Sequence, residues 1–211
     1  MAKRSLISFI YPNRCPFCNV VIKAGEFFCA YCARLDFCEN EGGSTFCCAY
    51  NDKSKPLITK AKENANGYAV SACAKLLYDS LMENNVMNKI DVITAIPARK
   101  AAMKQRGYSF PALLAKELAG LSGKKYSFKM LVLKREIEEQ KGLTAVERAE
   151  NLKGAFGAGR GVPGTPPKKN ILIIDDISTT GATLNEARHA LEAHAEKIYI
   201  AAFAKTCRGD Y

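Results

Sequence analysis

The sequence predicts an α/β protein: a parallel sheet with helices on both faces, preceded by a small cysteine-rich module. Beyond residue 60, short apolar runs alternate with helix-like segments, which is typical of a parallel sheet covered on both sides. Seven of the nine cysteines lie within the first 48 residues. The length of 211 residues suits one ordinary domain with a small accessory module. We expect the module to span residues 1–50 and the α/β domain residues 51–211.

The order of the expected elements follows from the spacing of apolar residues. Ile90 to Ile96 is apolar and ends at Pro97, which predicts a buried strand. The polar, Gly- and Pro-rich segment 135–170 predicts a long loop with one helix near 146–152. The full expectation is helices at 64–82, 111–121 and 184–194, and strands at 90–96, 130–133, 171–174 and 198–203.

Composition narrows the class of protein. Apolar residues make up 48% and charged residues 25%, which are globular proportions and exclude a disordered chain. No apolar run approaches the roughly 20 residues that span a bilayer, and the stretch 6–10 is shorter than the roughly 7–15 apolar residues of an export signal. We therefore expect a cytoplasmic protein without membrane insertion. The net charge of +10 favours anionic partners: phosphates, nucleic acid or a phosphorylated substrate.

Four cysteines have the spacing of a metal site. Two Cys-x2-Cys pairs are separated by ten residues, so a hairpin between them can bring four thiolates onto one zinc ion. A closed four-thiolate site leaves no open coordination position, so this zinc would be structural. A disulfide within each pair, or free thiols, is the alternative, although the odd cysteine count argues against a closed disulfide framework. The expected ligands are Cys15, Cys18, Cys29 and Cys32.

The other residues of the cysteine-rich module have less specific patterns. Cys38, Cys47 and Cys48 are irregularly spaced, which favours packing or chance over a second zinc half. The aromatic residues beside the Cys-x2-Cys pairs are expected to form the small core under the metal; a surface on which nucleic-acid bases stack is the alternative. These aromatics are Phe17, Phe27, Phe28 and Tyr31.

A phosphate site is predicted where the 171–174 strand ends. The strand delivers Asp175 and Asp176 to the edge at which open α/β sheets bind ligands, and a hydroxyl-rich turn then leads into a helix. Backbone amides and hydroxyls of residues 178–183, with the positive end of the helix dipole, suit a phosphate. Gly181 permits a close approach that a side chain would block. The alternative is an ordinary turn whose Asp and Thr residues cap the helix.

Charged residues near this turn indicate the rest of the ligand. Two acids beside a phosphate would repel it, which suggests that they bind another part of the ligand. Hydrogen bonding to both hydroxyls of a ribose is such a role, and Mg²⁺ could share the charge. After the 90–96 strand, Arg99, Lys100 and Arg106 occur without an intervening acid, which suits a pyrophosphate group. A solvated basic face is the alternative for this stretch.

The stretch 171–184 resembles the phosphoribosyltransferase signature, in which Asp-Asp-x3-Thr-Gly-x-Thr follows a hydrophobic strand and binds 5-phosphoribosyl 1-pyrophosphate. The resemblance implies that Asp175 and Asp176 contact the ribose hydroxyls and are the catalytic residues if transfer occurs. It implies that the turn holds the 5′-phosphate. The predicted phosphoribose-binding residues are Asp175, Asp176, Ser178, Thr179, Thr180, Gly181, Ala182 and Thr183.

The order of motifs along the chain resembles the ComF family of competence proteins. Tyr11-Pro12 precedes the cysteine pairs, Ile96-Pro97 and Arg106-Gly107-Tyr108 follow, and Asn151-Leu-Lys-Gly-Ala-Phe156 precedes the Asp-Asp turn. The resemblance implies a type I phosphoribosyltransferase-like fold with an N-terminal zinc ribbon. It also implies that segment 134–156 closes over the site. Where the family usually has Asn-Gln, this chain has Ser109-Phe110.

Two functional hypotheses follow from the resemblance. In the first, the protein binds phosphoribosyl pyrophosphate or a related phosphosugar and handles single-stranded DNA with DNA-uptake proteins during natural transformation. In the second, it is an active Mg²⁺-dependent phosphoribosyltransferase, a pentosyltransferase of nucleotide metabolism with an unknown acceptor. Residues 1–170 hold 27 Lys and Arg against 15 Asp and Glu, so the basic excess lies outside the phosphate motif. A nucleotide-sensing protein that catalyses nothing is a third possibility.

Overall fold

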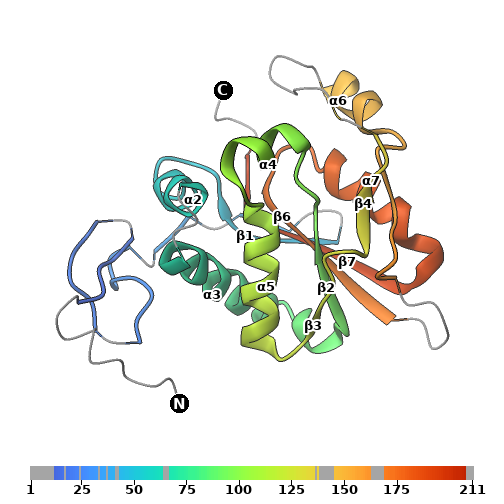
Figure 1. The fold of residues 1–211 in the computed structure, drawn as a ribbon. Helices are drawn as coiled ribbons and strands as arrows, with labels where there is room; N and C mark the ends of the chain where they lie inside the picture. Colours follow the sequence, from blue (N-terminus) through green and yellow to red (C-terminus); the bar gives the residue numbers. More distant parts are fainter. Residues whose placement is uncertain are drawn as a thin grey trace.

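A five-stranded sheet forms the centre of the protein (Figure 1). The computed structural model describes residues 12–16, 18–23, 25–32, 34–36, 38–40, 43–63, 67–135, 137, 145–162 and 169–207. The strand order is β1-β7-β6-β2-β3, and every pairing in this sheet is parallel. The strands are β1 (Ser44–Ala49), β2 (Val92–Ala95), β3 (Lys125–Tyr126), β6 (Lys169–Ser178) and β7 (Ala195–Lys205).

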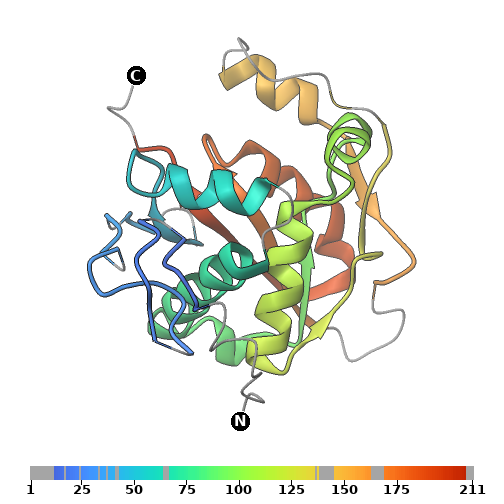
Figure 2. The same ribbon diagram turned by 60° about the vertical axis from the view of Figure 1, so that its left-hand side comes forward.

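Helices cover both faces of the sheet (Figure 2), which confirms the predicted fold class. On one face lie α3 (Gly67–Glu83) and α5 (Phe110–Ser122), with α2 (Lys55–Lys62) packed against α3. On the other face lies α7 (Ala182–Leu191). Side chains alternate along β6, so Leu172 and Ile174 join the first core while Ile171 and Ile173 join the second. Among the described helices, none is both long enough and apolar enough to cross a membrane.

The N-terminal part of the chain contributes β1 to the sheet, which the sequence analysis missed. β1 pairs with β7, so the chain enters the sheet at Ser44, before the boundary expected near residue 50. Cys48 is fully buried in the core, and its thiol donates to the Phe203 carbonyl at 3.5 Å. The Cys38 sulfur lies 3.5 Å from the sulfur of Cys207, which follows β7. Cys38 and Cys48 therefore pack within the α/β core.

The strand expected at 130–133 was assigned to the wrong sheet. β4 (Leu131–Leu133) pairs antiparallel with β5 (Phe156–Ala158) in a separate two-stranded sheet. This pair forms the base of a segment that contains α6 (Ala145–Leu152) and packs beside α7. A short apolar run is a local signal, which indicates a buried strand but not its partner. The partner, β5, lies more than twenty residues later.

Candidate functional site

The candidate site lies where β6 extends beyond its neighbour β2. β2 ends at Ala95, which pairs with Ile174, whereas β6 continues to Ser178 because β7 accompanies it to Lys205. The two acids therefore lie inside the strand, and not after it as expected. Extended pairing with β7 fixes the backbone of both acids at the carboxyl edge of the sheet, where parallel α/β sheets place ligands.

The two carboxyl groups point in different directions because successive side chains of a strand face opposite sides of the sheet. Asp175 is 8% exposed, and one of its oxygens accepts the Asp176 amide at 2.8 Å. Asp176 is partly exposed; one oxygen accepts the Ile177 amide at 2.7 Å, and the other lies 2.5 Å from the Lys62 ammonium. Asp176 is thus charge-paired, while Asp175 is buried beside it.

The environment of Asp175 favours its neutral form. Burial, and then the neighbouring charge of Asp176, raise the pKa of the Asp175 carboxyl well above its usual range. Lys62 opposes this shift, but its effect on the pKa is smaller than that of burial. A protonated Asp175 can donate a hydrogen bond as well as accept one, while Asp176 can only accept.

The turn after β6 presents backbone amides without protein partners. Among the described residues, no protein group accepts from the amides of Thr179, Thr180, Gly181 or Thr183. The Ala182 amide has a long 3.4 Å contact to the Thr180 hydroxyl. Several backbone donors therefore face no protein acceptor at the start of α7, an arrangement that suits an anion.

Gly181 is required by backbone conformation. Its φ of +77° is left-handed, a conformation that glycine adopts without strain. A Cβ placed there would meet only the Asn185 side-chain nitrogen at 3.7 Å, an ordinary contact. The positive φ is what constrains this position within the protein, and the expected close approach of a phosphate remains a prediction.

Ser178 adds a further donor at the base of the turn. The residue is 3% exposed, and its hydroxyl has no hydrogen-bond partner among the described residues. Its carbonyl accepts the Thr206 amide at 2.9 Å, so β7 holds the residue in place. A buried hydroxyl without a partner is uncommon in folded proteins and is consistent with a ligand or water contact at this position.

The three predicted pyrophosphate residues are placed differently. Arg99 follows β2 and precedes α4 (Lys100–Arg106), so Arg99 and Lys100 lie at the carboxyl edge beside β6. Arg106 is the last residue of α4, about 9 Å further along the helix axis, and its side chain is exposed. The fold thus brings Arg99 and Lys100 to the edge, and Arg106 lies at the other end of α4.

Lys62 is a site residue that the sequence analysis missed. It is the last residue of α2, and its carbonyl accepts the Tyr108 hydroxyl at 2.7 Å. This bond ties the end of α2 to the Arg-Gly-Tyr segment after α4. The buried residues Leu57, Ile58 and Ala61 are a helical signal, but eight residues are too few for the periodicity to stand out.

The segment between β4 and β5 is anchored beside α7. The Arg135 guanidinium donates to the carbonyls of Asn151 and Lys153 at 2.8 and 2.9 Å. The Gly154 amide donates to the Glu186 carboxylate of α7 at 2.7 Å. The base of this segment is therefore fixed to the helix that begins at the phosphate turn. Residues 138–144, in the middle of the segment expected to close over the site, lie outside the described part.

The four predicted zinc ligands lie together. The sulfurs of Cys15, Cys18, Cys29 and Cys32 are all within 4.8 Å of one another, and Cys18 and Cys29 are 3.7 Å apart. Zn–S bonds of about 2.3 Å in a tetrahedron give sulfur separations of about 3.8 Å, so the cluster fits one zinc ion. The Arg14–Val21 bridge closes the hairpin of the first pair, and the Cys15 amide donates to the Val20 carbonyl at 2.8 Å.

The aromatic residues of this module do not form a separate core. Phe27 and Phe28 pack against the core of the α/β domain, and the Tyr68 hydroxyl of α3 donates to the Glu26 carbonyl. Tyr31 is 86% exposed, so its expected place under the metal is wrong. The module is small enough for its aromatics to pack on the neighbouring helices instead. Phe17 lies outside the described residues.

Comparisons with known proteins agree with the motif order. No family model matches the chain. Competence protein F of Haemophilus influenzae is 26% identical over 153 residues, which cover 71% of this chain and 66% of that protein, slightly less than two thirds of its length. This similarity confirms the predicted resemblance to the ComF proteins.

Solved structures similar to this chain include two phosphoribosyltransferases. An adenine phosphoribosyltransferase is 16% identical with a TM-score of 0.46, and the match covers 73% of this chain and 75% of that one. The orotate phosphoribosyltransferase of Aeropyrum pernix is 15% identical with a TM-score of 0.43, and the match covers 74% of this chain and 65% of that one.

Loss of the metal is expected to destabilise the whole chain. A Cys18→Ser variant should lose zinc and release Phe27 and Phe28 from the core. We expect its free energy of unfolding to fall by about 2–4 kcal/mol. Zinc content per chain and urea denaturation measure both effects. Cys207→Ser is the matched control and should keep one zinc per chain. Equal zinc content in wild type and Cys18→Ser would contradict the four-cysteine site.

Replacing Asp175 by Asn is expected to stabilise the protein at neutral pH. The folded-state pKa is raised, so the stability contributed by Asp175 is fully present below the unfolded pKa near 3.9 and is lost as pH rises toward the folded value. Between the unfolded and folded pKa values of Asp175, the free energy of unfolding of the wild type should fall by about 1.4 kcal/mol per pH unit relative to that of Asp175→Asn.

Urea denaturation of both proteins from about pH 4 to about pH 8 measures this difference. Asn keeps an oxygen that can accept the Asp176 amide, so the comparison isolates the ionisation of the carboxyl. A stability difference that does not change with pH would contradict the raised pKa.

Proposed function

We propose that the carboxyl edge of the sheet binds 5-phosphoribosyl 1-pyrophosphate or a related phosphosugar, and that the protein serves DNA uptake in natural transformation. The observation that carries the first part is the continuity of β6 with the 178–183 turn. One strand holds two acids, and four of the next five residues present amides without partners among the described residues. The similarity to Competence protein F supports the second part.

Each part of phosphoribosyl pyrophosphate, called the donor below because it would donate the phosphoribosyl group, has a suitable protein group at this edge. The turn 178–183 takes the 5′-phosphate through its amides and the start of α7. Asp175 and Asp176 take the ribose hydroxyls, and the raised pKa of Asp175 favours the form that can donate as well as accept a hydrogen bond. Arg99 and Lys100 lie beyond the adjacent strand, on the side where the pyrophosphate would extend. Mg²⁺ bound with the phosphoribosyl pyrophosphate would share the negative charge of its phosphate groups.

Lys62 keeps this edge close to neutral. In the structure its ammonium balances Asp176, so an anionic donor does not approach two uncompensated carboxylates. The ammonium is partly exposed at the end of α2, and its long stem lets it turn toward a donor phosphate. We assign Lys62 to the donor-binding set alongside the residues expected from the sequence.

An active phosphoribosyltransferase is the alternative function. Here the bond from ribose C1 to the pyrophosphate oxygen breaks, a bond from C1 to an acceptor nitrogen forms, and the acceptor loses a proton. The anchoring of the 134–155 segment to α7 favours this alternative, because a segment fixed beside the turn can exclude water from C1. Pyrophosphate release with a panel of bases and amines separates this enzyme from a protein that only binds the donor.

The zinc module offers a surface for single-stranded DNA. Tyr31 lies between two predicted zinc ligands and is almost fully exposed, and Val20 and Val21 are about half exposed. Bases stack on exposed aromatic rings without sequence preference, while Lys and Arg contact the phosphates. We therefore place the DNA contact of the proposed function on this module, away from the donor site.

Donor binding is expected to depend on the Lys62–Asp176 pair. Isothermal titration with phosphoribosyl pyrophosphate and Mg²⁺ should give saturable binding to the wild type. Lys62→Met removes a cation from the donor site, and Asp176→Asn removes an acceptor for a ribose hydroxyl. Each variant should bind about tenfold more weakly, or about 1.4 kcal/mol.

The controls use a matched ion pair outside the site. Lys75 and Asp79 form a similar pair, 2.5 Å apart, on α3. Lys75→Met and Asp79→Asn should therefore bind the donor as the wild type does. Wild-type affinity in Lys62→Met and Asp176→Asn, or no saturable binding by the wild type, would refute the proposed donor site.

Stacking on Tyr31 is expected to contribute to single-stranded DNA binding. Tyr31→Ala should weaken binding of an oligonucleotide by about fivefold to about a hundredfold, since one stacked base contributes about 1–3 kcal/mol. Tyr31→Phe keeps the ring and should bind as the wild type does. Fluorescence anisotropy over a range of salt concentrations measures this effect. Equal affinity of Tyr31→Ala and wild type at each salt concentration would remove Tyr31 from the DNA contact.

A further inference from the structure

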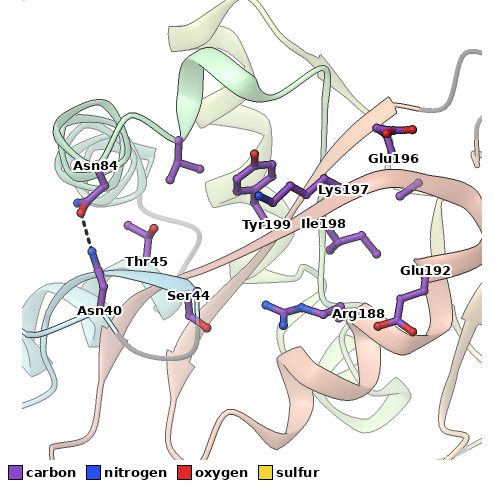
Figure 3. Close-up of a pocket in the computed structure, with 13 residues that line it drawn as sticks. Asn40, Ser44, Thr45, Asn84, Arg188, Glu192, Glu196, Lys197, Ile198 and Tyr199 are labelled. Atoms are coloured by element: carbon purple, nitrogen blue, oxygen red, sulfur yellow. Dashed lines mark hydrogen bonds between the residues drawn. The ribbon is translucent and has the colours of Figure 1, made fainter.

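A cavity of about 580 Å³ lies at the opposite edge of the sheet from the candidate donor site. Figure 3 shows it between the start of β1, the start of β7 and the C-terminal part of α7. Asn84, from the turn after α3, closes one side and accepts a hydrogen bond from Asn40 at 2.6 Å. The volume is within the range of pockets that bind small molecules.

Arg188 is the residue in this cavity whose bonding is incomplete. Its Nε atom is buried and has no hydrogen-bond partner, and its guanidinium forms no ion pair with any described residue. Glu192, one helical turn later, pairs instead with His189 at 3.2 Å. Figure 3 shows the guanidinium extending toward Ser44, away from Glu192. A buried donor without a protein partner calls for an acceptor from outside the chain.

The other lining groups divide the cavity into two ends. Near Arg188 lie the hydroxyl side chains of Ser44 and Thr45, and Lys197, whose ammonium is 5.2 Å from the centre of the Tyr199 ring. On the side away from Ser44 and Thr45 lie two exposed carboxylates, Glu192 and Glu196, which accept hydrogen bonds (Figure 3). Donors therefore gather at one end and acceptors at the other.

We propose that this cavity binds a small organic anion, with a phosphate or carboxylate group on Arg188 and a hydroxyl or amino group toward Glu192 and Glu196. The planar guanidinium can donate two parallel hydrogen bonds to either oxyanion. Lys197 and the two hydroxyls add charge and donors at the same end. An inorganic ion would occupy only a small part of 580 Å³, which favours a ligand with a polar body.

Site-resolved nuclear magnetic resonance tests this proposal separately from the donor site. Ribose 5-phosphate and citrate are titrated into the ¹⁵N-labelled full chain, as probes with a phosphate and a carboxylate head. At least one of them should shift the amides of Ser44, Thr45 and Tyr199 in a saturable way. Shifts at Thr180 and Gly181 report the donor site in the same spectra, so failure at either site is seen independently.

Two variants decide the role of the guanidinium. Arg188→Gln should weaken the response at Ser44, Thr45 and Tyr199 about tenfold or more, because it removes a charged donor, while leaving Thr180 and Gly181 responsive. Lys197→Gln should weaken the same response. Arg160→Gln, an exposed residue on the turn after β5, is the matched control and should behave as the wild type does.

The outcomes separate the possible ligands. A response to ribose 5-phosphate alone supports a phosphate ligand, and a response to citrate alone supports a carboxylate. A response to both supports an oxyanion site that accepts either. No response of the three cavity amides to either probe, or an equal response in wild type and Arg188→Gln, overturns the proposal.

Discussion

The pairing of β6 with β7 is the interaction on which the candidate site depends. β7 follows β6 to Ser178, four residues past the point where β2 stops, and so keeps Asp175 and Asp176 extended. Without that ladder the two acids would belong to a loop, and the turn after them would have no fixed starting point. Gly181 then reverses the chain into α7 through its positive φ. A strand that extends beyond one neighbour thus places charged groups at an open sheet edge.

The two acids show how one sheet edge gives neighbouring residues different chemistry. Asp176 faces α2 and is paired with Lys62, whereas Asp175 is buried and its pKa is raised. Two adjacent ionised carboxylates with no counter-ion would repel each other and any phosphate nearby. The pairing of Asp176 with Lys62 and the raised pKa of Asp175 both reduce that repulsion. The positioning of Lys62 in turn depends on Tyr108, which bonds to the end of α2.

The sequence predicted those parts of the molecule that short-range patterns encode. The apolar run at 171–174, the helix after Gly181 and the two Cys-x2-Cys pairs are local signals, and the structure contains all three. Lys62 and β1 could not be predicted in this way, because their roles depend on partners more than a hundred residues away. The pairing of β4 was mistaken because a short apolar run does not show which strand it pairs with. The aromatic residues of the zinc module were misplaced because Phe27 and Phe28 pack on the neighbouring domain while Tyr31 is exposed.

The position of β7 has a consequence for synthesis of the protein. β7 is synthesised after the other four strands of its sheet, yet it lies between β1 and β6. β1 therefore has no neighbour in this sheet until β7 has been synthesised, and the nascent chain must keep that edge from aggregating. Such non-local pairing also slows folding. If the cysteine pairs bind zinc early, the chain just before β1 would fold before β7 has been synthesised.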